Sequence, residues 1–415
     1  MKKKKNRMLV FHSAYTYEFI KKYGLEIFVT SRDASGVFQD VLTVSPIASL
    51  QYDKNDNRRF SKPEIFYLDD RNLIIEGKVA RYRFLQWFPK VNFLIAQVSL
   101  IAFILKHGNL TRISLVRSED PRFNGLYGYI FSRMLRKPLI VGVWGNPGRL
   151  RDLNGKPNMP NLFKSLKREE QIETFVLRRA KIVLAQNQEN LDFAINSGVE
   201  LSKTCITPLA LGIHASHFLP LNERLDVSRD FDEWGAIDCF TLICISRLES
   251  LKMVDHSILA VDVLKKSGIK FKLILVGEGR ESLNLINLAR NLGLDEHIIF
   301  AGNRTQEWIS GAMKFVDVNI APLCGRSLLE ASLSGCPAVA YDVDWHSEIV
   351  KDGKSGFLTP NLDYMALGES LVTLHRDGVL RMKMRETMQS LAKSIAKPAD
   401  IASLQRSIYQ KLTSQ

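Results

Sequence analysis

Two segments in the second half of the chain combine charged side chains with turns in a way that suits an anionic ligand. In the first, an apolar run ending at Ser246 leads into Arg247 and Lys252, just before a predicted helix over 254–265. Ligands of open α/β sheets bind beyond the carboxyl ends of the strands. A planar guanidinium and a compact ammonium there can clamp a diphosphate. A solvated loop explains the same two cations, so the pair alone does not decide the function.

The second segment is an apolar run that turns at Gly325 into a predicted helix beginning with Arg326, Ser327 and Leu328. Backbone N–H groups at the start of such a helix bind anions without help from a particular side chain. Glu330 follows one turn later, where a carboxylate can accept hydrogen bonds from a ribose diol. The alternative is a glycine turn followed by an acidic residue that favours the helix dipole.

Short apolar, β-branched runs alternate with longer segments of helical period along most of the chain. This alternation is typical of parallel α/β sheets covered on both faces, and two doubly wound halves fit it better than one sheet or a barrel. The runs span 7–11, 26–31, 41–45, 64–68, 112–117, 138–144, 181–186 and 204–211 in the first half, and 240–246, 271–277, 298–302, 316–321 and 337–341 in the second. The run over 91–105 contains Asn92, Gln97 and Ser99 and is too short for a membrane span, so it predicts a buried helix.

In their order along the chain, the two segments resemble the C-terminal domain of family 4 glycosyltransferases. The resemblance rests on Arg247 with Lys252, then LILVGEG (273–279), FAGN (300–303), DVNIAPLCGRSLLEASLSGCPAVAYDV (317–343) and HSEIVKDGKSGFLTP (346–360). It implies a GT-B fold, in which two doubly wound Rossmann-like domains face a cleft and C-terminal helices cross back to the N-terminal domain. The expected domains are a basic acceptor-binding domain over 1–210, a linker over 211–226, a nucleotide-sugar-binding domain over 227–395 and a returning helix over 396–415.

The resemblance also implies roles for individual residues. Arg247 and Lys252 would neutralise the departing diphosphate together with the amides of Ser327 and Leu328, and Glu330 would hold the ribose. The remaining expected donor-binding residues are Gly277, Glu278, Gly279, Asn303, Gly325, Arg326 and Glu348. The implied reaction is retaining transfer from a UDP- or GDP-sugar, with no cofactor and no metal.

Two positions depart from the family pattern. The first Glu of the E-x7-E pair would fall at position 322, which is Pro322, and the His-Gly pair of the N-terminal domain is replaced by Trp144-Gly145. Either change can alter the choice of donor sugar, and both together allow an inactive homologue. On the acceptor side we expect contributions from His12, Arg117, Glu119, Trp144 and Asn146.

Positive charge is concentrated in the first half of the chain. The chain has 57 Lys and Arg against 44 Asp and Glu, and residues 1–200 hold 33 of the former against 19 of the latter. The excess mixes with aromatic residues over 81–90 and continues in Lys2–Lys5, which suits an anionic membrane surface. A solvated basic surface is the alternative, and nucleic acid is a poorer one because no zinc-finger or RNP-like motif occurs.

These features lead us to expect a glycosyltransferase that acts on a glycan acceptor, preferably lipid-linked, in bacterial surface-polysaccharide (O-antigen, capsule or exopolysaccharide) biosynthesis. No secretory signal is recognisable, and five cysteines without paired spacing suggest reduced thiols. We therefore expect a cytoplasmic protein, peripheral on the inner face of the plasma membrane. The alternatives are a catalytically impaired glycosyltransferase-like scaffold and a sugar-nucleotide 2-epimerase on a similar fold.

Overall fold

The chain folds into two compact units. The first comprises Met1–Leu211 with Pro398–Gln415, and the second Gly212–Lys397. The computed structural model describes residues 6–12, 15–33, 35–52, 56–148, 151, 155–160, 162–343 and 345–414, so the expected basic stretch Lys2–Lys5 lies outside the described residues.

The first unit is built on an eight-stranded sheet with the order β3-β4-β2-β1-β5-β6-β7-β8. All neighbours are parallel except the edge strand β3, which pairs antiparallel with β4. The strands are β1 (Arg7–Phe11), β2 (Asp40–Ser45), β3 (Glu64–Tyr67), β4 (Asn72–Glu76), β5 (Ile113–Ser118), β6 (Leu139–Val143), β7 (Ile182–Ala185) and β8 (Thr204–Ile206). The central strands β1, β2 and β6 are buried along their whole length, as expected for a sheet covered on both faces.

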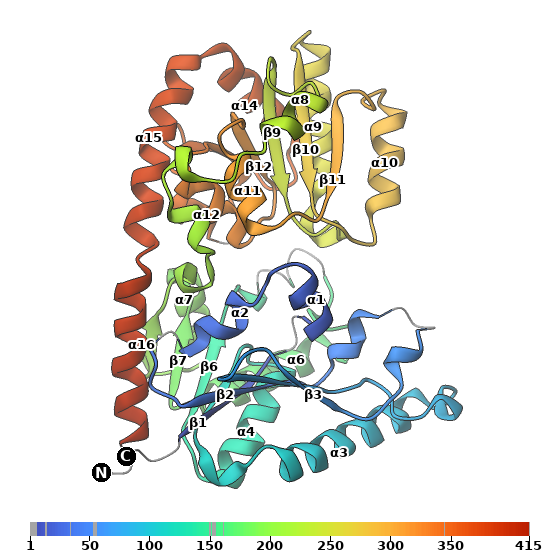
Figure 1. The fold of residues 1–415 in the computed structure, drawn as a ribbon, viewed down its shortest axis with the longest axis vertical. Coiled ribbons are helices and arrows are strands. Elements are labelled where there is room, and N and C mark those ends of the chain that lie inside the picture. Colours follow the sequence, from blue (N-terminus) through green and yellow to red (C-terminus); the bar gives the residue numbers. More distant parts are fainter. Residues whose placement is uncertain are drawn as a thin grey trace. The chain divides into compact units, whose positions relative to one another are not determined.

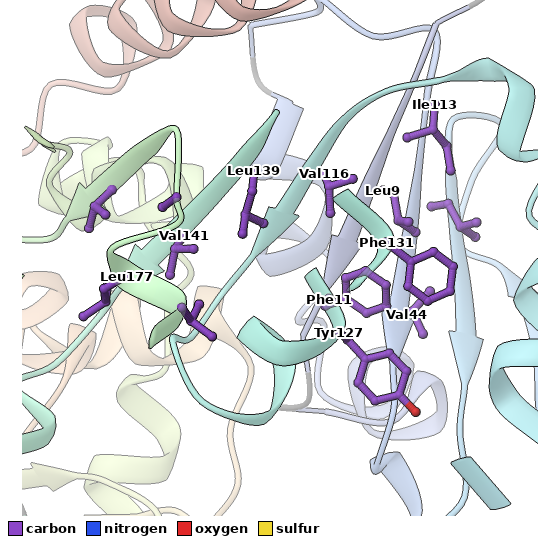
Figure 2. Close-up of a cluster of buried hydrophobic side chains, with 14 of the residues drawn as sticks. Leu9, Phe11, Val44, Ile113, Val116, Tyr127, Phe131, Leu139, Val141 and Leu177 are labelled. Carbon is purple, nitrogen blue, oxygen red and sulfur yellow. The ribbon is translucent and has the colours of Figure 1, made fainter. Parts of the chain in front are cut away.

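Helices cover the two faces of this sheet, and alternate residues of each strand point to opposite faces. One face packs against α3 (Pro89–His107), α4 (Phe123–Leu135) and α6 (Leu166–Leu177), in the cluster that includes Phe11, Val44 and Phe131 (Figure 2). The other face packs Met8 and Val10 against Tyr409 and Leu412 of the C-terminal helix α16 (Pro398–Thr413). Further α-helices of the unit are α1 (Tyr17–Lys22), α2 (Ile27–Thr30) and α7 (Gln188–Asn196).

The second unit contains a six-stranded, all-parallel sheet with the order β11-β10-β9-β12-β13-β14. Figure 1 labels β9, β10, β11 and β12 of this sheet. Its strands are β9 (Phe240–Ile245), β10 (Phe271–Val276), β11 (Ile298–Gly302), β12 (Val318–Ala321), β13 (Ala338–Tyr341) and β14 (Gly356–Thr359). Its helices are α8 (Ser228–Glu233), α9 (Val254–Lys266), α10 (Ser282–Asn291), α11 (Gln306–Ala312), α12 (Arg326–Leu333), α13 (His346–Ile349), α14 (Tyr364–Arg376) and α15 (Gly378–Ile395). The central strand β9 therefore lies between β10 and β12, although β12 follows it by more than 70 residues.

Residues 212–226 of the expected linker belong to the second unit and are ordered there. It forms the 3-10 turns η8 (Ala215–Phe218) and η9 (Leu221–Glu223), and the buried Arg224 donates to the carbonyl of Ser310 at 3.2 Å. Ser310 in turn donates to the carbonyl of Ser216 at 2.8 Å. Buried polar groups must be hydrogen-bonded, and these bonds fix the segment to α11.

Of the C-terminal helices, α16 belongs to the first unit, in line with the returning helix expected over 396–415. The helices α14 and α15 remain in the second unit, where α14 packs against α9. Among the strands, the run over 26–31 forms the helix α2 instead, and β4 and β14 were not predicted.

The prediction that residues 91–105 form a buried helix is wrong about burial. They lie within α3, where Leu100 and Ile104 are in the core but Leu94 is 63% exposed. In the described part of the chain α3 is the single helix long and apolar enough to cross a membrane, and 28% of its most apolar window is buried.

Candidate functional site

The carboxyl ends of β9, β10, β11 and β12 meet at one edge of the second sheet, as parallel strands require. The expected donor-site residues follow these ends. Arg247 follows β9, Gly277 to Gly279 follow β10, Asn303 follows β11, and Gly325 precedes α12 after β12. The topology therefore brings together segments that are separated by up to 80 residues in the sequence.

Two hydrogen bonds join the loop after β9 to the loop after β12. The Ser327 hydroxyl donates to the carbonyl of Ile245 at 2.8 Å, and the ammonium of Lys252 donates to the carbonyl of Leu323 at 3.2 Å. The two segments for which the sequence predicted anion binding are thus hydrogen-bonded to each other. Lys252 holds its charge beside the turn that leads to Gly325.

The Arg247 side chain, unlike that of Lys252, is not held by another loop of the described chain. The residue is exposed, and its side chain makes no hydrogen bond or ion pair within the part of the chain that the structure describes. Its backbone position is fixed, because Ser246 N–H donates to Val276 at 3.0 Å and Leu248 N–H donates to Glu278 at 3.0 Å. The guanidinium is therefore available to a ligand while the turn that carries it is anchored.

The turn after β10 requires glycine. Gly277 has φ +142°, and a Cβ atom there would lie 1.9 Å from the carbonyl oxygen of Ser246. A Cβ at Gly279 would lie 2.1 Å from the carbonyl oxygen of Leu248. Only glycine permits the β10 turn to approach the β9 turn so closely. Glu278, between the two glycines, is exposed.

The start of α12 at Gly325 has no side-chain cap among the described residues. No atom lies within 4 Å of the place a Cβ would take there. The amide of Leu328 donates to the carbonyl of Gly325 at 3.2 Å, and its role as an anion donor stays a prediction. This bond closes a tight first turn of the helix. The Ser327 amide, in contrast, makes no backbone hydrogen bond to any described residue.

Glu330 lies one turn inside α12 and is only 3% exposed. Its carboxylate pairs with the guanidinium of Arg326 at 3.1 Å, and Arg326 also donates to the carbonyl of Gly212 at 3.0 Å. This pairing orients the carboxylate, and it directs the Arg326 guanidinium toward Glu330 and Gly212. Glu348 is half-buried on the short helix α13.

Sequence reasoning missed a histidine beside this site. The ring nitrogens of His346, which is fully buried, lie 2.9 Å from the carbonyl of Tyr341 and 3.1 Å from the carbonyl of Cys324. His346 thereby joins the end of β13 to the loop before Gly325. The sequence carries no signal for this contact, since a histidine at the start of a short helix can have many different partners.

Four of the five expected acceptor-side residues come together in the first unit, at the carboxyl ends of β1, β5 and β6. Glu119 forms an ion pair with Arg117 at 2.7 Å and accepts from the Trp144 indole at 2.6 Å, and its carboxylate lies 3.5 Å from Arg32. His12 lies 2.8 Å from Arg32 through its Nδ1. The fifth residue, Asn146, is outside this network and donates to Glu189 at 3.0 Å.

Two members of this network were not predicted, Arg32 and Tyr409. The Tyr409 hydroxyl on α16 accepts from Arg117 and donates to the carbonyl of Arg32 at 2.9 Å. A tyrosine almost 300 residues from Arg117 gives no local sequence signal for such a contact. We name Arg32, Arg117, Glu119, His12, Trp144 and Tyr409 the buried ionic network.

Burial and charge shift the protonation of this network. Burial, aided by the Arg32 guanidinium, lowers the pKa of His12 from 6.5 to about 3, so this imidazole is neutral at pH 7. Burial by itself would raise the pKa of Glu119, but the guanidiniums of Arg117 and Arg32 outweigh it and lower that pKa. Burial also lowers the pKa of Arg32 to about 10. One carboxylate therefore balances two guanidiniums.

Residues 231–391 match the family model described as glycosyl transferases group 1. This segment is a group 1 glycosyltransferase domain. It contains Arg247, Lys252, Glu330 and the glycine turns described above, and the predicted resemblance to family 4 glycosyltransferases is confirmed.

Curated relatives resemble parts of the chain. The phosphatidyl-myo-inositol mannosyltransferase of Mycobacterium leprae is 39% identical over 115 residues, which is 26% of this chain and 30% of that protein. The alpha-D-kanosaminyltransferase of Streptomyces kanamyceticus is 23% identical over 277 residues, which is 64% of this chain and 68% of that protein. The chain spans between 15% and 53% of the length of the first three curated relatives that it matches.

Solved structures share the fold of the whole chain. The HepE protein of Anabaena, solved in complex with UDP-glucose, superimposes with a TM-score of 0.69 at 18% identity, over 99% of this chain and 100% of that one. At this identity the likeness shows the fold. The predicted GT-B fold, with two parallel-sheet domains, is thereby confirmed.

Proposed function

We propose that this protein is a retaining glycosyltransferase that moves a sugar from a UDP- or GDP-sugar to a glycan acceptor. The observation that carries the proposal is the junction of the β9 and β12 loops. There Arg247 is exposed, Lys252 and Ser327 fasten the two loops, and the start of α12 at Gly325 is open. Each of these groups favours a diphosphate.

The chemistry follows from the charge of the leaving group. As the bond between the sugar C1 and the diphosphate oxygen breaks, negative charge grows on the diphosphate. Arg247 and Lys252 would stabilise that charge without reorganising, because their turns are held by backbone hydrogen bonds. The proposed reaction needs no metal and no cofactor, since the two cations and the Ser327 amide serve the leaving group.

Glu330 would accept hydrogen bonds from the ribose hydroxyls. Its pairing with Arg326 at 3.1 Å fixes the carboxylate on α12, one turn from Gly325. The glycine turn at Gly277–Gly279, with Asn303 after β11, would border the base. The uridine diphosphate bound to solved structures of the same fold supports the donor class.

The proposed acceptor is a lipid-linked glycan in bacterial surface-polysaccharide biosynthesis, reached from the inner face of the plasma membrane. Two observations support this part. The first unit carries the excess of positive charge, and one curated relative is named for a phosphatidylinositol acceptor. The cytoplasmic location and the anionic membrane as partner belong to the same proposal.

A catalytically impaired scaffold is the second candidate, and a specific observation favours it. Pro322, where the family pattern has an acidic residue, is buried directly after β12, and its side chain has no group that could hydrogen-bond to a sugar. Donor binding without transfer would support this candidate over the enzyme. A 2-epimerase would need carboxylate and histidine acid–base groups at the donor site, and the buried His346 is held between two carbonyls.

The test is a thermal-shift screen against UDP, GDP, ADP and their common sugar conjugates. A nucleotide at about 100 times its dissociation constant stabilises the protein by about 2.7 kcal/mol. We expect one of the UDP or GDP series to raise the Tm of the wild type, and Arg247→Ala to remove most of that rise.

Arg280→Ala is the matched control, since Arg280 is also exposed and lies just beyond the glycine turn. It should retain the shift. No shift with any nucleotide, or equal shifts in Arg247→Ala and the wild type, would contradict the proposed donor site.

A further inference from the structure

Helix α3 is packed with its polar residues inward. The Asn92 side chain accepts from the amides of Arg81 and Tyr82 at 2.7 and 3.0 Å, and the Gln97 amide donates to the carbonyl of Lys78 at 3.2 Å. Rotating the helix would leave these buried groups without partners, at a large cost in free energy. The buried amides therefore force the opposite face of α3 outward.

That outward face is apolar. Within α3 its members Val91, Leu94, Val98 and Leu105 are three, four and seven residues apart, which places them on one side of the helix. The turn before α3 continues the same character, with the Trp87 side chain 81% exposed. We define the α3 face as the exposed apolar residues Phe84, Trp87, Phe88, Val91, Leu94, Val98 and Leu105. Contiguous exposed apolar surface of this kind marks an interaction site.

Helix α3 is packed firmly against the core of the first unit. Leu100 and Ile104 are fully buried in the core cluster with Phe11 and Phe131, so one side of α3 is needed by the fold. A helix fixed in this way can enter a lipid interface sideways but cannot cross the bilayer. The α3 face is thus suited to lying in the plane of a membrane.

The positive charge around α3 favours an anionic partner for the α3 face. Between Glu76 and Glu119 the sequence has seven Lys and Arg and no Asp or Glu. Four of these cations lie in α3 or in the turn before it and are exposed or half-exposed: Arg81, Arg83, Lys90 and Lys106. Lys90 in the first turn of α3 and Lys106 in the last are both exposed. A second copy of the chain would bring like charges together at this face, which opposes self-association. An anionic lipid surface attracts the cations and receives the apolar side chains.

We infer that the α3 face is a membrane-docking surface that inserts its aromatic and aliphatic side chains into the headgroup region of an anionic bilayer. The inference deepens the proposed function, because a lipid-linked acceptor would be presented at that surface. The membrane contact is thereby assigned to α3, which the sequence predicted to be a buried helix.

The first test is binding of the full chain to vesicles of phosphatidylcholine with phosphatidylglycerol, against vesicles of phosphatidylcholine alone. The double variant Leu94→Gln/Val98→Gln removes apolar contacts from exposed positions, so the fold should survive. We expect about tenfold weaker binding or more. The control Leu283→Gln/Val379→Gln changes equally exposed positions, each 67% exposed in the second unit, and should bind as the wild type does.

The second test uses Trp87 as a depth probe. The other four tryptophans, Trp144, Trp234, Trp308 and Trp345, are buried or half-buried. Vesicles with brominated acyl chains should quench Trp87 on binding, and Trp87→Phe should lose most of the quenching. Quenching that is unchanged in Trp87→Phe would overturn the assignment to this face.

Three further outcomes overturn the inference: no binding to anionic vesicles, equal binding of Leu94→Gln/Val98→Gln and wild type, or a concentration-dependent dimer that this variant abolishes. The nucleotide thermal shift is measured on the same samples. A retained shift without vesicle binding removes only the membrane inference. Vesicle binding without any nucleotide shift removes only the proposed donor site.

Discussion

Replacing Glu119 by Gln should strongly destabilise the first unit. The Glu119 carboxylate faces two buried guanidiniums, Arg117 at 2.7 Å and Arg32 at 3.5 Å, and its own side chain is 8% exposed. The neutral imidazole of His12 supplies no counter-charge. The substitution therefore leaves two buried cations close together without an anion.

The size of the effect follows from this geometry. Breaking a buried ion pair by removing one partner costs about 3–5 kcal/mol, because the remaining charge stays desolvated. Gln keeps the volume of the side chain and an oxygen that can accept from the Trp144 indole, so we expect a value near the lower end, about 3 kcal/mol. High salt should not restore the stability, since screening acts weakly on buried charges.

The assay is urea unfolding of the full chain followed by circular dichroism and by tryptophan fluorescence, which reports on Trp144. Glu170→Gln is the matched control, because Glu170 forms a 3.5 Å pair with Arg151 but its side chain is 56% exposed. An exposed pair of this kind contributes about 0–1 kcal/mol. A loss below about 1 kcal/mol for Glu119→Gln, or one equal to the control, would refute the reasoning.

Two further predictions test the glycine turn and the histidine. Gly277→Ala should destabilise the second unit by about 2 kcal/mol or more in urea unfolding, since its Cβ would meet the Ser246 carbonyl at 1.9 Å, whereas Gly145→Ala, with no atom within 4 Å, should be nearly neutral. For His12 the folded pKa is about 3 and the ordinary value 6.5, so only the unfolded chain binds the proton between these limits and stability falls as the pH falls through that window. Between pH 7 and 5 the wild type should therefore lose about 2 kcal/mol more than His12→Asn, and parallel pH profiles would show that His12 is not buried neutral.

Local sequence pattern was enough for most of the sheet strands and for the turns at the candidate site. Runs such as 240–246 and 271–277 are continuous and apolar because both faces of a parallel sheet are buried, which makes them visible in the sequence. The strands β4 and β14 were not predicted, although β4 is as long as the predicted strand β1. The run over 26–31 has β-branched residues, yet Val29 packs with Ile20 and Ile74 as part of a helix, so tertiary contacts outweighed propensity.

The sequence by itself determined which residues follow strand ends, and hence that Arg247, Lys252 and Gly325 belong to one edge of the second sheet. Only the tertiary structure decided that Lys252 and Ser327 join the β9 and β12 loops, and that Tyr409 meets Arg117 from the far end of the chain. It alone decided which side of α3 faces outward, because that helix is apolar on both sides. The physical reason is the same in each case: a strand or turn is encoded by neighbouring residues, whereas the partner of a buried polar group is chosen by residues distant in the sequence.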